Sequence, residues 1–131
     1  MLTRKRKQEK KPALKYLELC KQRAEHIPLQ HLTHQACFMG YDFYVDERVL
    51  VPRQDTEVLA EEALDRLKEI PNPKILDMCT GSGCLLLSIL MERSDAFGTG
   101  VDISGRTHLR LPDRQKNLNL EERVSFRYKV I

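Results

Sequence analysis

Hydrophobic and polar positions along the chain alternate between helical and strand-like spacing. Residues 12–28 predict an amphipathic helix ended by Pro28, because apolar positions recur at intervals of three and four, at Leu14, Leu17, Cys20 or Lys21, and Ala24. An apolar stripe of this kind has to be buried against another surface. A neighbouring element is therefore expected beside this helix.

Residues 36–52 are rich in aromatic and β-branched side chains, which favour strands, and Asp46-Glu47-Arg48 offers a turn between two of them. This pattern predicts a β-hairpin. A second helix is predicted over residues 55–70, with Asp55 or Thr56 as its N-cap. Its apolar stripe contains Leu59, Ala63, Leu67 and Ile70. Pro71 and Pro73 then end the helix.

The segment from residue 74 to residue 103 predicts a βαβ unit. A strand over residues 74–78 leads into a small-residue loop, an uncharged helix over residues 84–93 and a second strand over residues 98–103. Parallel strands joined in this way have a right-handed crossover and bind ligands at their carboxyl ends. We therefore expect an α/β fold with an incomplete Rossmann-like, parallel core, preceded by a helix and a hairpin.

The loop after the first strand, residues 79–83, has the composition of a ligand site, and we call it the glycine loop. Gly81 and Gly83 leave the backbone and the following helix N-terminus open to a ligand. Asp102 ends the second strand, where a carboxylate can accept both hydroxyls of a ribose, and Asp77 near the end of the first strand suits a cationic ligand. A tight turn without a ligand explains the glycines but not the two carboxylates.

Two common nucleotide motifs are excluded by the residues that follow Gly83. A P-loop would continue with Lys and Ser or Thr, but Cys84 and Leu85 stand there. A dinucleotide fingerprint would place a small residue where Leu86 stands. The pattern therefore favours S-adenosylmethionine, which carries both an ammonium and a sulfonium, over a phosphate-transfer or nicotinamide cofactor.

Composition limits the fold and the compartment. The 131 residues are 41% hydrophobic, which suits one soluble domain, and residues 1–12 hold six of the 22 basic residues against one acid. Charged ends of this kind are usually solvated, so a nucleic-acid partner is not expected. No apolar run approaches the ~20 residues of a membrane span and no secretory signal is present, so we expect a cytoplasmic protein without membrane contact.

No metal site is expected. The four cysteines form no C-x-x-C pair, which favours free thiols, and the three neighbouring histidines lack carboxylate or thiol partners at ligand spacing. We interpret these histidines, which are His26, His31 and His34, as surface or packing residues.

Two stretches of the chain resemble a known family. ILDMCTGSGCLLLSIL (residues 75–90) followed by GTGVDIS resembles the cofactor motifs of class I S-adenosylmethionine-dependent methyltransferases. PLQHLTHQACFMGYDFYVDERVLVPRQDTEVL, from Pro28, is similar to the linker hairpin and following loop of the release factor glutamine methyltransferases, which have a characteristic V-L-I-P-R-P-[DE]-T-E stretch. The resemblance covers residues 28–103.

The resemblance implies transfer of a methyl group from S-adenosyl-L-methionine to the glutamine side-chain amide in the Gly-Gly-Gln motif of peptide chain release factors. The cofactor-binding residues would be Asp77, Cys79, Thr80, Gly81, Ser82, Gly83 and Asp102, and a pocket loop would contain Pro52, Arg53, Thr56 and Glu57. Residues 1–35 would be a basic tail and remnant of a helical substrate-binding domain, residues 36–54 the linker, and residues 55–131 a C-terminally truncated methyltransferase domain.

Departures from the family pattern leave alternatives open. Cys79 replaces a loop glycine, which fits if its φ is negative, and Gln54 and His34 replace a proline and another glycine. The family's Asn-Pro-Pro-Tyr motif, which positions the amide, is absent, so the catalytic residues are unassigned. A non-catalytic fragment that binds the cofactor is one alternative, and nucleic-acid adenine methylation is another.

Residues 105–114 do not fit the family pattern. They have no helical stripe, and Pro112 stands where a helix interior would run. The family pattern returns at residues 115–126 and predicts a third strand. We hypothesise that altered reading frames in the gene produced this segment, and we expect a sheet of three parallel strands with an exposed apolar edge.

Overall fold

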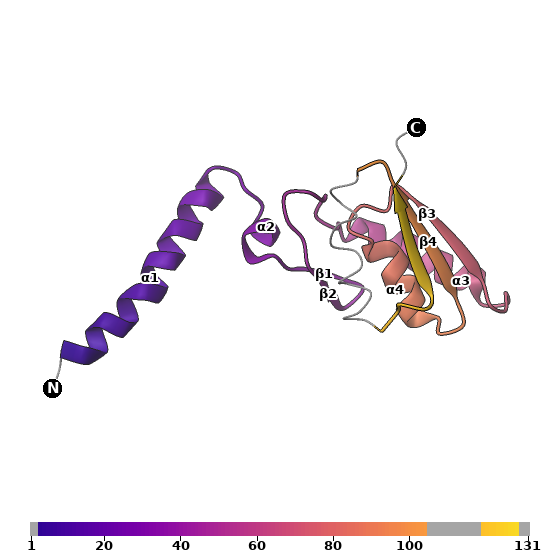
Figure 1. The fold of residues 1–131 in the computed structure, drawn as a ribbon, viewed down its shortest axis with the longest axis horizontal. Helices are drawn as coiled ribbons and strands as arrows, with labels where there is room; N and C mark the ends of the chain where they lie inside the picture. Colours follow the sequence, from indigo (N-terminus) through magenta and orange to yellow (C-terminus); the bar gives the residue numbers. More distant parts are fainter. Residues whose placement is uncertain (1–2, 105–118, 129–131) are drawn as a thin grey trace.

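The computed structural model describes residues 3–104 and 119–128, with side chains from Pro12 onward. Its centre is a parallel sheet of three strands, β3 (Lys74–Met78), β4 (Phe97–Asp102) and β5 (Val124–Tyr128), which lie in that order (Figure 1). The register pairs Lys74 with Phe97 and Gly98 with Val124. The predicted parallel βαβ unit and the third strand are confirmed. The anomalous segment 105–114 lies outside the described residues.

Helix α4 (Cys84–Glu92) packs against one face of this sheet. Its side chains Leu86, Leu87 and Leu90 are fully buried. Gly98 of β4 permits this approach, because a Cβ at that position would lie only 2.7 Å from Leu86 Cδ1. The uncharged run after Gly83 is therefore a core helix, and it begins where the sequence predicts.

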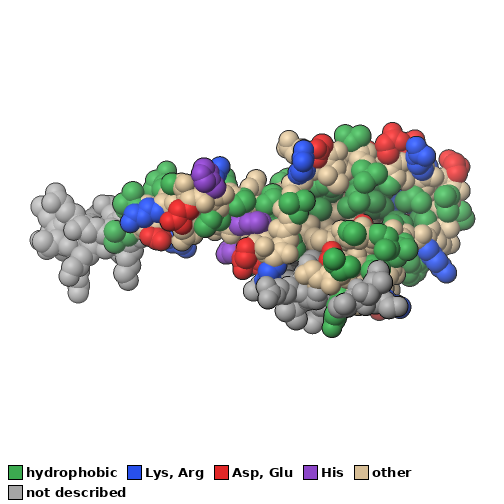
Figure 2. Space-filling model, turned by 90° about the horizontal axis from the view of Figure 1, so that it is seen from above, with side chains coloured by type: hydrophobic (Ala, Val, Ile, Leu, Met, Phe, Trp, Pro, Cys, Tyr) green, Lys and Arg blue, Asp and Glu red, His purple; other side chains and the backbone are tan. Residues whose placement is uncertain are grey.

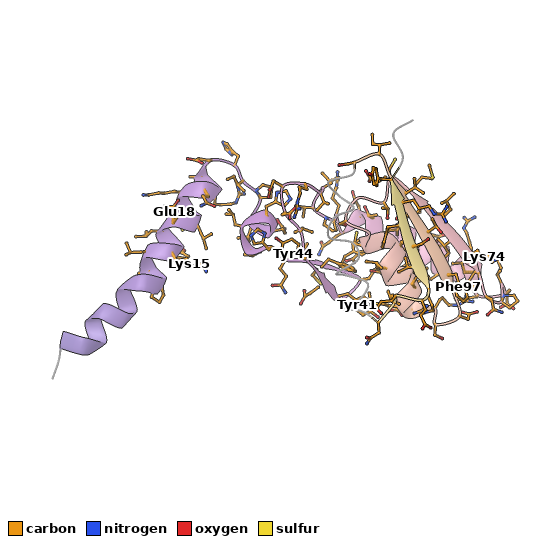
Figure 3. The ribbon with its side chains drawn as sticks, in the orientation of Figure 1. Lys15, Glu18, Tyr41, Tyr44, Lys74 and Phe97 are labelled. Carbon is orange, nitrogen blue, oxygen red and sulfur yellow. The ribbon has the colours of Figure 1, made fainter. Side chains whose placement is uncertain are left out.

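The opposite face of the sheet, which we call the open face, carries exposed apolar side chains. Leu76 and Met78 of β3 lie on it and are 63% and 62% exposed. Lys74 and Phe97 stand side by side at the amino end of this face (Figure 3). Hydrophobic side chains are visible over much of the α/β part of the molecule (Figure 2). Among the described strands, β3 is an edge of the sheet and carries the exposed Leu76 and Met78, so the predicted exposed apolar edge is confirmed there.

Helix α3 (Asp55–Leu67) packs beside α4, and two of the four predicted stripe residues, Ala63 and Leu67, pack against the core. Ala60 is fully buried and Leu64 packs against the same core. Leu59 and Ile70, predicted to face inward, are 56% and 49% exposed. The predicted stripe is therefore confirmed in part, and its buried side also includes Ala60 and Leu64 because α4 and the hairpin determine which face is covered.

The hairpin consists of β1 (Ala36–Phe38) and β2 (Tyr41–Phe43), so the predicted turn position is wrong. Met39 and Gly40 form the two-residue turn, with φ of 52° and 76°. Two left-handed residues match the twist of a tight hairpin, and glycine favours this conformation. Residues 46–48 instead form a separate turn, in which Val49 N–H donates to the Asp46 carbonyl at 3.1 Å.

The hairpin is packed on the α/β part rather than standing free. Phe38 and Phe43 are buried in the core cluster that contains the α4 leucines. Tyr41, labelled in Figure 3, donates its hydroxyl to Glu92 at 2.7 Å, and Met39 N–H donates to Glu57 Oε1 at 2.8 Å. The division of the chain at residues 35 and 54 remains a prediction.

Helix α1 (Thr3–Ala24) extends away from the α/β part (Figure 1). It ends before Pro28, because His26 adopts φ of 66° and Ile27 N–H bonds back to the Gln22 carbonyl at 3.4 Å, a Schellman arrangement. Leu14 and Leu17 are 65% and 55% exposed. Among the described residues, nothing covers the predicted apolar stripe.

Helix α2 (Leu29–Thr33) is held to the chain after the hairpin by two histidines. His31 Nε2 lies 3.1 Å from the Val49 carbonyl oxygen, and His34 Nδ1 lies 3.3 Å from that of Val45. The His34 ring also stacks on Tyr44, with centroids 5.2 Å apart. These contacts confirm a packing role for both histidines.

Arg93 connects the ends of two helices. Its guanidinium donates to the carbonyls of Leu67, the last residue of α3, and of Ile70. It also pairs with Asp95, whose Oδ1 lies 3.0 Å from Nε. Asn72 N–H donates to Asp95 Oδ2 at 2.9 Å. The hydrogen bond from Arg93 and that from Asn72 lower the pKa of Asp95 to about 2.

Candidate functional site

The carboxyl ends of β3 and β4 bring the two predicted carboxylates to one edge of the sheet. Asp77 accepts a hydrogen bond from the Thr80 hydroxyl, with an O–O distance of 2.6 Å. Thr80 N–H in turn donates to the Val101 carbonyl at 3.0 Å, so the glycine loop is tied to β4. The backbone hydrogen bond to β4 therefore holds Thr80 in a position where its side chain contacts Asp77 on β3.

The environment of Asp77 favours its neutral form. Burial raises the pKa of Asp77 above its ordinary value, and the charge of Asp102 raises it further. The hydrogen bond from Thr80 acts in the opposite direction, because it stabilises the ionised carboxylate. An ionised Asp77 would gain from a cation bound beside it, which suits the predicted ligand.

Asp102 closes the other side of the glycine loop. Its Oδ2 accepts from Gly81 N–H at 2.9 Å, and its Oδ1 accepts from Ser104 N–H at 2.9 Å. A residue 21 positions away along the chain is thereby held against the loop. The structure thus brings Asp102 to the loop, as the βαβ topology predicts.

The glycine loop has an unusual backbone. Gly81 and Gly83 have φ of 52° and 75°, and Cys79 has φ of 62°. The expectation that Cys79 fits through a negative φ is therefore wrong, and its side chain occupies a conformation that costs about 1 kcal/mol or more outside glycine. This position explains why a glycine is usual there in the family it resembles.

The glycine loop faces the segment that follows the hairpin, residues 50–56, which we call the linker loop. Between them lies a cavity of about 180 Å³, the loop cavity. Eight of the predicted site residues line it, namely Pro52, Arg53, Thr56, Asp77, Cys79, Thr80, Gly81 and Ser82. The structure therefore brings together two loops that lie more than 20 residues apart in the sequence.

Three predicted site residues lie away from the wall of the loop cavity. Gly83 is the residue before α4, and Asp102 lies behind the cavity lining, where its Oδ2 accepts from Gly81 N–H. Glu57, predicted to belong to the pocket loop, accepts the Met39 N–H and so holds the hairpin turn. The predicted N-caps are also wrong, because Gln54 precedes the helix and makes no capping side-chain hydrogen bond.

Four lining residues were not predicted, and they are Leu50, Val51, Cys84 and Leu85. Leu50 is 82% exposed, which is unusual for leucine, and it stands at the start of the linker loop. Its position directly before Val51-Pro52-Arg53 was the sequence feature that could have indicated that Leu50 lines the cavity. Cys84 and Leu85 line the cavity because α4 begins immediately after the glycine loop.

Arg53 sits in the linker loop at the surface. It forms an ion pair with Asp55 at 2.8 Å, and both side chains are largely exposed. Exposed pairs of this kind contribute little to stability. Arg53 therefore contributes little to the fold and is available to contact a bound molecule.

Among the described residues there is no group of three or more His, Cys, Asp or Glu side chains that would hold a metal ion. No helix in this part of the chain is long and apolar enough to cross a membrane. The cysteines Cys20, Cys37, Cys79 and Cys84, all of which the structure describes, form no disulfide bonds, as predicted.

Comparison with known proteins identifies relatives by sequence, although no family model matches the chain. A release factor glutamine methyltransferase of Chlorobaculum tepidum is 40% identical over 90 residues, which cover 65% of this chain and 31% of that protein. The protein of the same name from Clostridium acetobutylicum is 37% identical over 83% of this chain and 38% of its own length. That of Nitratidesulfovibrio vulgaris is 32% identical over 96% of this chain and 42% of its own length.

The fold is also found among solved structures. A protein of Galdieria sulphuraria described as a sarcosine dimethylglycine methyltransferase superposes with a TM-score of 0.50, at 17% identity, over 59% of this chain and 28% of that one. This likeness shows an incomplete α/β fold of the methyltransferase kind. By sequence, the chain is a relative of the release factor glutamine methyltransferases and spans about 31–42% of the length of the proteins compared above.

Proposed function

We propose that the loop cavity binds S-adenosyl-L-methionine and that the chain serves methylation of a glutamine side-chain amide in peptide chain release factors. The observation that carries the proposal is the loop cavity itself, in which the glycine loop and the linker loop face each other across about 180 Å³. The sequence relatives named above support the reaction and the substrate class.

The residues of the cavity fit such a cofactor. A Cβ added at Gly81 would meet nothing nearer than the Cys79 carbonyl oxygen, 3.9 Å away, so the protein's own packing does not exclude a side chain there. A side chain at this position would instead take up space on the cavity wall. Gly81 therefore serves the ligand and the left-handed backbone, and not the core.

Each acidic residue has a distinct role in the proposal. Asp77, half-buried beside the cavity, would attract the positively charged amino acid end of the cofactor. Asp102 would accept hydrogen bonds from the ribose hydroxyls while it keeps Gly81 in place. The bound cofactor supplies an electrophilic methyl group on a sulfonium.

The amide nitrogen of glutamine is a poor nucleophile because its lone pair is delocalised, so the enzyme must hold it close to the methyl group. Leu50, Val51 and Pro52 would exclude water from one side of the cavity. Arg53, which lines the same cavity and is exposed, is placed to contact the substrate.

Calorimetric titration with S-adenosyl-L-methionine and S-adenosyl-L-homocysteine tests the cofactor, and mass spectrometry of a release factor after incubation tests the transfer. A gain of one methyl group on the Gly-Gly-Gln peptide supports the full proposal. Binding without transfer supports the second candidate, a segment that binds the cofactor without catalysis, because the residues predicted to bind the cofactor line the loop cavity. Absence of binding of either cofactor would refute both.

A further inference from the structure

A second cavity lies on the other side of the linker loop. It measures about 570 Å³ and is lined by Gln30, Cys37, Pro52, Arg53, Gln54 and Asp55, together with the start of β1. We call it the hairpin groove. Pro52 and Arg53 line both this groove and the loop cavity, so these two residues form a common wall between them.

One border of the hairpin groove is an unpaired strand edge. In the β1–β2 register, Phe38 faces Tyr41 across the two-residue turn, and Cys37 faces Asp42. Opposed pairs in an antiparallel ladder alternate between bonded and non-bonded, so Cys37 and Asp42 form a non-bonded pair. The N–H and C=O of Cys37 therefore point away from β2, and the described residues supply no strand beside them.

The other border offers side-chain amides. Gln54 lies just before α3 and makes no capping side-chain hydrogen bond, and Gln30 lines the groove from α2. A primary amide can both donate and accept, which suits the backbone of a peptide. The Arg53–Asp55 ion pair leaves this wall without net charge, so the groove suits a neutral segment.

We propose that the hairpin groove binds an extended segment of the polypeptide substrate, which adds as a strand to the outer edge of β1 and passes over Pro52 and Arg53 to the loop cavity. The proposal rests on the function proposed above for the loop cavity. Main-chain hydrogen bonds along β1 would supply affinity, as in other complexes formed by strand addition. The common wall then determines which side chain of the segment reaches the cofactor.

Three exposed thiols allow binding at each place to be measured separately, because Cys37 lines the groove, Cys79 lines the loop cavity and Cys20 lies on α1. The whole chain is alkylated with iodoacetamide, and the rate at each cysteine is followed by mass spectrometry. A short synthetic peptide containing Gly-Gly-Gln should slow the reaction of Cys37 and leave Cys20 unchanged. S-adenosyl-L-homocysteine should slow Cys79 and leave Cys37 unchanged.

The matched variants are Cys37→Pro and Asp42→Pro. Each removes an outward N–H from one edge of the same hairpin, but only Cys37 borders the groove. Loss of one backbone hydrogen bond should weaken peptide binding roughly two- to tenfold in Cys37→Pro and leave it unchanged in Asp42→Pro. A peptide methylated at alternate backbone nitrogens should bind less tightly, and Cys37→Ala should bind normally.

Equal peptide binding by both proline variants, or an unprotected Cys37 at saturating peptide, would overturn the groove proposal. If Cys37→Pro unfolds, the proposal is decided by whether the peptide protects Cys37 of the unaltered chain from alkylation. Failure of S-adenosyl-L-homocysteine to protect Cys79 would instead count against the cofactor site, and protection of Cys37 by the peptide would still support the groove.

Discussion

The hydroxyl of Thr80 donates a hydrogen bond to the half-buried carboxylate of Asp77, with 2.6 Å between the two oxygens. Burial and the neighbouring charge of Asp102 raise the pKa of Asp77, and this hydrogen bond counteracts both. Thr80 is itself buried and held by β4 through its backbone. The pKa of Asp77 thus depends on Thr80, a neighbouring residue of the predicted cofactor site.

Replacement of Thr80 by valine should raise the pKa of Asp77 further, since the group that stabilises its charged form is lost and burial remains. Carboxyl carbon shifts of Asp77, followed by NMR across an acid titration, would measure the change. Thr80→Ser keeps the hydroxyl and serves as the control. An unchanged pKa in the valine variant would show that Thr80 does not tune Asp77.

Asp77→Asn should make the folded chain more stable at pH 7. The folded protein holds the pKa of Asp77 above the ~3.9 of an unfolded aspartate. In the pH window between these two pKa values, the folded protein therefore binds more protons than the unfolded chain. The free energy of unfolding contributed by this group therefore falls as pH rises through the window, and the loss is complete above the folded pKa. Thermal unfolding at pH 7 and at low pH would show the gain at pH 7 only.

The same Asp77→Asn variant should bind S-adenosyl-L-methionine more weakly, because the charge proposed to attract its amino end is gone. A variant with lower stability at pH 7 and full cofactor affinity would contradict both statements. Stability gained together with affinity lost would be the trade that is typical of functional residues.

Asp102→Ala should weaken S-adenosyl-L-homocysteine binding by about 1–3 kcal/mol, the cost of losing charge-assisted hydrogen bonds. The substitution also leaves Gly81 N–H without its acceptor. Asp102→Asn separates the two effects, because its amide oxygen can still accept from Gly81. Calorimetry measures S-adenosyl-L-homocysteine binding by both variants, with the exposed Asp42→Ala as the control. Equal affinities of all three variants would contradict the assignment of Asp102 to the ribose.

Gly100→Ala should lower the free energy of unfolding by about 1–3 kcal/mol, as overpacking does in a closely packed site. A Cβ there would lie 2.5 Å from two ring atoms of Phe126 and 2.9 Å from Thr80 Oγ1. Gly98→Ala is the matched comparison, since a Cβ there would lie farther from its neighbours, at 2.7 Å from Leu86 Cδ1, 3.0 Å from Leu90 Cδ1 and 3.2 Å from Leu86 Cγ. Urea unfolding should rank Gly100→Ala as the more damaging, and the reverse order would contradict the packing described.

Asp95→Asn should reduce stability near neutral pH and have little effect in strong acid. Arg93 and the Asn72 N–H hold the pKa of Asp95 at about 2, below the unfolded value. The stabilisation is therefore complete above the unfolded pKa of ~3.9 and is lost as pH falls through about 2. Melting temperatures of both proteins across this range should converge at the acid end, and parallel curves would rule out the ionic contribution.

The βαβ unit was predictable from sequence because its information is local. Residues 74–78 and the helix start at Cys84 were located correctly, since an apolar run, a small-residue loop and an uncharged helix follow one another without ambiguity. The carboxyl-end rule then placed Asp77 and Asp102 at one edge of the sheet. The hairpin turn was misplaced because Met39 lacks the usual turn chemistry, and only Gly40 indicated it.

Tertiary structure alone decided which surfaces meet. The face that α3 buries follows from the positions of α4 and the hairpin, so Ala60 turns inward and Leu59 does not, although both are apolar. The two loops that enclose the loop cavity are joined by a helix and a strand, and no periodicity in the sequence records their approach. Local spacing determines which element forms, whereas side-chain volumes from distant segments determine how the elements pack and which residues share a cavity.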